Sequence, residues 1–162
     1  MIDQLESIDR WIVLTINSWN SSFMDELMWF ISAKTTWIPL YLLLIYLGFR
    51  KLELKQFLIY FLCVVGAVAL ADLISVHLFK EFFLRYRPSH HAALTEKLHF
   101  YVEENGNGYK GGMYGFVSSH ASNFFALAIS AGLILRPYYP KLRWWLILIA
   151  VIICFSRIYL GV

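Results

Sequence analysis

Apolar stretches of about 20 residues constrain this chain most, because that is the length an α-helix needs to cross a lipid bilayer. Hydrophobic residues make up 59% of the 162 residues, more than a small soluble domain with a polar surface accommodates. Such stretches lie at 26–49, 56–79, 119–135 and 142–162. The sequence therefore predicts an all-α fold: a membrane helix bundle of four spans that forms a single domain over 1–162. We expect a bend in the first span near 32–34 and a helical continuation of the second to about 86.

An amphipathic helix is expected at 2–19, before the first span. Its apolar residues recur at helical spacing: Leu5, Ile8, Ile12, Ile16 and Trp19. A helix of this kind suits the bilayer surface, where tryptophans lie at the level of the headgroups. The alternative is a short first span, which the charged pair Asp9-Arg10 interrupts.

Basic residues are concentrated in two turns on one face of the expected bundle. The turns at 50–55 and 136–143 contain Arg50, Lys51, Lys55, Arg136, Lys141 and Arg143, against Glu53. The positive-inside rule places this face in the cytoplasm, so the opposite helix ends face outward. We expect a multi-pass protein of the cell (inner) membrane, surrounded by membrane lipid. The net charge of +3 is small and scattered, which does not indicate a nucleic-acid partner.

The outer end of the second span carries Lys80 and, seven residues later, Arg87-Pro88. Seven residues are about two turns of helix, so both cations are expected to point the same way. Lysine as a point charge and arginine as a planar fork together suit a phosphate. The alternative is that both anchor the helix end by reaching toward headgroups.

The third span opens with Val117-Ser118-Ser119-His120. Free backbone N–H groups and the helix dipole make a helix N-terminus attractive to an anion. Ser118 is expected to cap the helix and to donate to a phosphate oxygen. The alternative is an ordinary capping serine followed by an interfacial histidine.

Ser156-Arg157 lies deep in the last apolar stretch. An arginine there is unfavourable unless it is paired or near the surface, and a phosphate in a shared pocket would pair it. The alternative is an arginine that reaches the headgroups. Since the spans alternate in direction, all three blocks are predicted to meet on the outer face.

Two other features have structural interpretations. Asp72, inside the second span, is expected to form a structural hydrogen bond. The polar connection at 88–117 lies outside the membrane near the site, and its length suggests a functional or disordered loop. Its histidines, His90, His91 and His99, do not match the spacing of metal ligands and are expected to be solvated.

Together the blocks resemble the signature of the type 2 phosphatidic acid phosphatase superfamily, which runs K-x6-R-P, P-S-G-H and S-R-x5-H-x3-D. Here Val117 replaces the proline and Ser119 the glycine, and the resemblance spans roughly 72–162. It implies a metal-independent lipid phosphatase that needs no cofactor. In that family the histidine of the third block attacks phosphorus and forms a phosphohistidine, with the following aspartate as its partner.

Carried over residue by residue, the resemblance implies that His120 is the general acid. It implies a phosphate clamp of Lys80, Arg87, Ser118, Ser119 and Arg157. The third block is incomplete, because the sequence reaches Val162 one position before the nucleophilic histidine. The C-terminal part of the domain is therefore expected beyond this sequence, and these 162 residues alone are expected to be inactive.

The predicted function is dephosphorylation of a membrane lipid phosphate or pyrophosphate. Undecaprenyl pyrophosphate, phosphatidylglycerol phosphate, phosphatidic acid and lipid A phosphates all fit the resemblance, and by analogy with the family a site on the outer face favours the carrier-lipid pyrophosphate. One alternative is a membrane protein that binds phosphate headgroups without turnover. Another is a membrane scaffold or transporter component whose cations only anchor it. The oligomeric state does not follow from the sequence.

Overall fold

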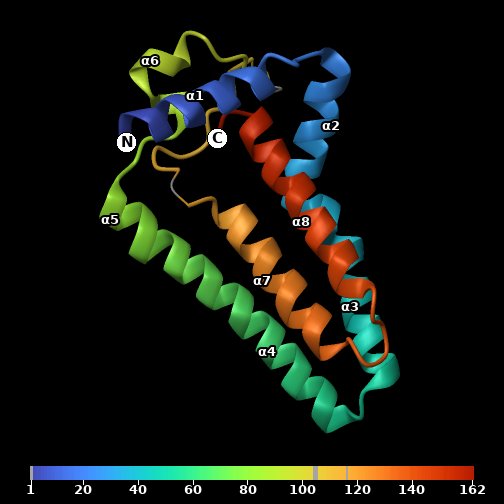
Figure 1. Cartoon of the computed structure of the whole chain (residues 1–162). Coiled ribbons are helices and arrows are strands. Elements are labelled where there is room, and N and C mark those ends of the chain that lie inside the picture. Colours follow the sequence, from blue (N-terminus) through green and yellow to red (C-terminus); the bar gives the residue numbers. More distant parts are fainter. Residues whose placement is uncertain (1, 104–105, 116) are drawn as a thin grey trace.

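The chain is helical throughout most of the part that the structure describes. A computed structural model describes residues 2–103, 106–115 and 117–162 (Figure 1). Its helices are α1 (Ile2–Asn17), α2 (Ser22–Ser32), η1 (Lys34–Trp37), α3 (Ile38–Lys51), α4 (Leu54–Leu73), η2 (Ile74–Lys80), α5 (Glu81–Phe83), η3 (Pro88–His90), α6 (Ala92–Thr95), α7 (Ser119–Ile134) and α8 (Leu142–Tyr159). The described residues contain no strand, only two isolated β-bridges. The all-α prediction is confirmed.

The long helices run between the same two ends of the bundle (Figure 1). The α3–α4 and α7–α8 turns lie at one end, and α1 lies across the other (Figure 1). α7 packs between α4 and α8, and small residues there let the backbones approach closely. Ala131 and Ala150 are fully buried in this core, and Arg143 packs against Gly132. The blocks predicted to share a face therefore do lie at the same end of the bundle.

Within the described residues, two helices are long and apolar enough to cross a bilayer. They are the continuous helix Leu54–Phe83 and α8, Leu142–Tyr159. The pair Ser22–Ser32 and Lys34–Lys51 makes a third if it is one span, and its 63° bend lies where the sequence predicted one. α7 is apolar but has only 16 residues, so the count of four spans stays a prediction.

The helix after the second span ends earlier than predicted. Helical structure stops at Phe83, and Leu84 has a positive φ of 46°. From there the chain is irregular, and Tyr86 forms an antiparallel bridge with Tyr114. The interpretation of Lys80 and Arg87 as neighbours on one helix face is therefore wrong. The backbone at 85–87 is instead hydrogen-bonded to the end of the connecting loop. Arg87 N donates to Met113 O (3.0 Å), and Gly115 N donates to Arg85 O (3.0 Å).

The N-terminal segment is a helix, as predicted. It lies across the end of the bundle opposite the α3–α4 and α7–α8 turns (Figure 1). Val13 is buried with Leu94 and Leu98 of the connecting loop. Trp11 and Ile8 are 66% and 54% exposed. This exposed apolar face suits the surface of a bilayer, which supports the interfacial placement.

Candidate phosphate site

The N-terminus of α7 is fixed against the π-helical turn η2. Ser119 Oγ accepts a hydrogen bond from Lys80 Nζ at 2.7 Å and lies 2.8 Å from Ser75 Oγ. Ser75 is 2% exposed, whereas Lys80 is half-buried. π-helical turns occur frequently at functional sites, and this one presents Lys80 to the first turn of α7.

Two further polar contacts hold the same helices together one turn deeper. Ser122 Oγ donates to Ala71 O at 3.3 Å, and Asn123 Nδ2 donates to Asp72 Oδ1 at 3.0 Å. The structural hydrogen bond predicted for Asp72 is confirmed. These contacts fix the register of α7 against α4, and so the distance between Lys80 and the second block.

Ser118 occupies the N-cap position of α7, as predicted, but its side chain makes no capping hydrogen bond. Its carbonyl accepts the first intrahelical bond, from Ser122 N at 3.0 Å. The expectation that the hydroxyl caps the helix is therefore wrong, and the serine hydroxyl that is bonded at this helix start is that of Ser119, with Lys80 and Ser75.

Arg87 reaches the site from the loop and is held by backbone groups. Its Nε donates to Tyr114 O at 3.1 Å. Three glycines lie beside its side chain: Gly111, Gly112 and Gly115. Burial and the nearby charge of Arg157 lower the pKa of the Arg87 guanidinium. These two cations repel each other, which favours an anion between them.

Gly115 is expected to be necessary for the position of Arg87. A Cβ built on Gly115 would lie 2.5 Å from Arg87 Cγ and 3.2 Å from Arg87 Cα. Gly115→Ala should therefore displace Arg87 and weaken phosphate binding by about tenfold, the loss of one charged hydrogen bond. A phosphate titration followed by ³¹P NMR would measure this.

The matched control is Gly66→Ala. A Cβ on Gly66 meets nothing within 4 Å, so this variant should bind phosphate as the unmodified protein does. Equal affinity of both variants would show that the contact between Gly115 and Arg87 does not determine phosphate binding.

Arg157 is buried and bridges two distant segments. Its Nη1 donates to Ser32 Oγ at 2.5 Å, and its Nη2 lies 3.5 Å from the hydroxyl of Tyr109. It is only 5% exposed, and its Nε has no hydrogen-bond partner within the described residues. A buried arginine with an unused donor can accept an anionic ligand.

His120 lies half-buried in the first turn of α7, within the field of several cations. The charges that act on its ring belong to Arg157, Lys34, Arg87 and Lys80. The structure thus gathers Lys80, Arg87, Ser119, His120 and Arg157 at one end of the bundle, from four separate elements. In general, fixed cations can bind a phosphate ester, and an imidazole placed among them can exchange a proton with it.

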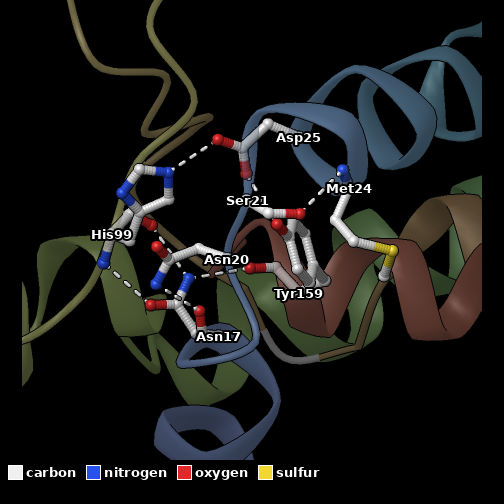
Figure 2. Close-up of polar contacts among 7 residues, drawn as sticks. All are labelled: Asn17, Asn20, Ser21, Met24, Asp25, His99 and Tyr159. Carbon is white, nitrogen blue, oxygen red and sulfur yellow. Dashed lines mark hydrogen bonds and ion pairs between the residues drawn. The ribbon is translucent and has the colours of Figure 1, made fainter.

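A polar network anchors the end of α8 just beyond Arg157 (Figure 2). The Asn17 amide donates to His99 O and Tyr159 O, both at 2.8 Å, and accepts from His99 N at 2.7 Å. Asp25 accepts from Tyr159 OH at 2.6 Å and pairs with His99 Nε2 at 2.8 Å. His99 is an exposed loop residue, as predicted, but its loop is also bonded to α1 and α2, which the sequence did not indicate.

Removing the Asn17 side chain should destabilise this junction. Asn17 is 3% exposed, and truncation leaves two carbonyls and one amide without their partner. Asn17→Ala should lower the free energy of unfolding by about 2 kcal/mol. Thermal unfolding in detergent would measure this, with the exposed Asn20, which makes a single bond at 3.1 Å, as the control position. Equal unfolding midpoints for Asn17→Ala and Asn20→Ala would contradict it.

Sequence reasoning missed several residues around these side chains: Ser32, Ser75, Tyr109 and Lys34. Ser32 and Arg157 are separated by 125 positions, so no spacing could relate them. Tyr109 packs edge-on against Trp29 at 4.9 Å and also faces Arg157. The only available signal was the break in the first apolar segment at 32–34.

The helical bundle, with its apolar helices and a cationic cluster at one end, has the features of a membrane protein that binds anions. Residues 56–162 match the sequence profile of the PAP2 superfamily. Since this match covers more than half of the chain, the chain belongs to the PAP2 superfamily, as its three blocks predicted.

Two curated proteins are similar to the chain along 99% of its length. They are the lipid A 4'-phosphatase of Porphyromonas gingivalis, 34% identical over 161 residues, and the lipid A 4'-phosphatase of Bacteroides thetaiotaomicron, 30% identical over 161 residues. The chain spans 65% of the length of the first relative and 69% of the second. No solved structure matches the chain.

Proposed function

We propose that this protein removes a phosphate group from a membrane lipid through a phosphohistidine intermediate. The observation that carries the proposal is the convergence of Lys80, Arg87 and Arg157 on the helix start that holds Ser119 and His120. Three fixed cations stabilise the charge that spreads over the phosphoryl oxygens in the transition state. Covalent catalysis divides the displacement into two easier steps.

Each side chain has a distinct role in this proposal. Lys80, Arg87 and Arg157, with the hydroxyls of Ser118 and Ser119, hold the phosphoryl oxygens. His120 donates a proton to the oxygen of the leaving lipid. The nucleophilic histidine of the third block follows the position of Val162 in the family pattern. Val162 itself lies beside Gly111, which also contacts the Arg87 side chain.

A phosphate of a lipid A-type glycolipid is the proposed substrate. Among the four lipids that the sequence left open, this one agrees with the names of both relatives. An apolar groove of about 390 Å³ lies between α3, α4 and α7 and is lined by Tyr41, Val64 and Phe124. Asn123 also lines it, one turn below Ser119, so a lipid tail in the groove is continuous with a phosphate at the helix start.

Phosphate release with the third block complete tests the proposal. We expect release from a lipid A phosphate to continue in excess chelator and to stop with vanadate, which imitates five-coordinate phosphorus. A requirement for a divalent ion would overturn the metal-independent mechanism. Phosphate binding without any release would favour the alternative of a headgroup-binding protein.

We place the proposed site on the face of the inner membrane that points away from the cytoplasm. The support is the basic character of the α3–α4 and α7–α8 turns, which lie at the end opposite the site (Figure 1). With Cys63 and Cys154 replaced by alanine, a cysteine at Lys141 should resist an impermeant maleimide in intact cells. A cysteine at Glu96 in the loop should react. The reverse pattern would invert the orientation.

A further inference from the structure

Lys34 lies at the break between α2 and α3 and is the first residue of the 3₁₀ turn η1. Side chains three residues apart in a 3₁₀ helix eclipse each other, so Lys34 and Trp37 share a side. The turn is fixed by Thr36 Oγ1, which donates to Phe30 O at 2.6 Å, and by Trp37 Nε1, which donates to Ile31 O at 2.8 Å. Lys34 is therefore carried by a well-bonded turn.

The side of η1 that carries Lys34 faces the start of α7. The Trp37 ring packs edge-on against Phe124, with centroids 5.6 Å apart. Phe124 is one helical turn beyond His120, and the η1–α3 segment and α7 run in the same direction (Figure 1). Lys34 is one turn before Trp37, and His120 is one turn before Phe124. Since Trp37 and Phe124 are in contact, Lys34 is at the level of His120 along the bundle. The Lys34 charge is indeed among those that act on the His120 ring.

The same turn touches the site from a second direction. Ser32, two residues before Lys34, accepts the hydrogen bond from Arg157 Nη1 at 2.5 Å. The turn that carries Lys34 is therefore connected to Arg157 through Ser32, and the Lys34 charge acts on His120. It does not belong to any of the three family blocks, which begin at Lys80.

Lys34 is an exposed residue and, among the described residues, makes no hydrogen bond or ion pair. A cation within a bent apolar helix pair needs a partner. A phosphate monoester carries a charge of about −1.5 to −2, which Lys80, Arg87 and Arg157 already balance. A fourth cation at the site is thus left over unless the ligand carries a further negative group.

We propose that Lys34 binds a second anionic group of the substrate, attached close to the phosphate that is removed. The inference rests on the proposed function and extends it: the substrate is at least a double anion at its headgroup. The second group is either another phosphate or a carboxylate, because both accept hydrogen bonds from an ammonium. Because the Lys34 charge acts on His120, the proposed general acid, the second group would lie on the side of the leaving group.

Small anions test this without a lipid tail. Phosphate, pyrophosphate and phosphonoacetate are titrated into the protein in an uncharged detergent, and ³¹P NMR gives the affinities. We expect pyrophosphate to bind at least about tenfold more tightly than phosphate. Lys34→Gln should reduce the pyrophosphate affinity about tenfold and the phosphate affinity less than threefold. Lys34→Arg should keep the preference, and Lys55→Gln, at the opposite end of the bundle, should leave all affinities unchanged.

The outcomes are separable. A Lys34-dependent gain for pyrophosphate alone supports a second phosphate, and a gain for phosphonoacetate as well shows that a carboxylate suffices. Equal losses for phosphate and pyrophosphate would make Lys34 part of the phosphate clamp and overturn the inference, as would no loss for either. Absence of phosphate binding by the unmodified protein would overturn the proposed function itself.

Discussion

Replacing Arg157 with glutamine is expected to reduce kcat/KM for a lipid phosphate by about 10²–10³, the usual loss for one preorganised donor to a transition state. Arg157 is 5% exposed and is held by Ser32, so its guanidinium needs little rearrangement when the phosphate binds. Its free Nε is a donor that a ligand oxygen can use. Glutamine keeps a side chain that can bond to Ser32 but removes the charge and the fork.

Arg136→Gln is the matched control, since Arg136 is an exposed arginine in the turn at the other end of the bundle. Its activity should stay within twofold of the unmodified protein. Arg157→Lys separates charge from geometry, because lysine keeps the charge and loses the planar fork. Thermal unfolding in detergent shows whether each variant is folded. A folded Arg157→Gln protein with unchanged kcat/KM would remove Arg157 from the clamp.

Replacing His120 with alanine is expected to reduce turnover of an alkyl phosphate by about 10²–10⁴, the range for loss of a general acid. The His120 ring is half-buried and lies in the first turn of α7, next to Ser119, which is hydrogen-bonded to Lys80. The size of the loss should depend on the leaving group, because an alkoxide needs a proton and a nitrophenolate does not. The same variant should therefore be much less impaired on a nitrophenyl phosphate.

His77→Ala provides the control for this experiment. His77 is in the same η2 turn as Lys80, but its side chain is 61% exposed and paired with Glu81. Turnover of both substrates should be unaffected by this change. An equal loss for His120→Ala on the alkyl and the nitrophenyl ester would assign His120 a role in binding rather than in proton donation.

Hydropathy and short motifs predicted much of this molecule. Apolar segments located the long helices, and the polar interruption at Ser32-Ala33-Lys34 located the 63° bend. Ser118 before an apolar run marked the start of α7. These features depend on neighbouring residues along the chain, which a single sequence displays directly.

Contacts between distant residues could not be predicted in this way. The sequence predicted helix up to about 86, but the positive φ of Leu84 and the bridge from Tyr86 to Tyr114 end it earlier. Arg87 therefore reaches the site through a loop rather than along a helix face. The sequence also did not indicate that the N-terminal third contacts the site, because the hydrogen-bond partners of Asn17 and Ser32 lie 82 to 142 positions away along the chain.

A structure with bound vanadate tests the central claim most directly, namely that separate helix ends surround one phosphate. The account predicts one anion within about 3 Å of the donors of Lys80, Arg87 and Arg157, at the amide end of α7 beside His120. An anion bound elsewhere, or these three cations too far apart to contact the same ion, would contradict it.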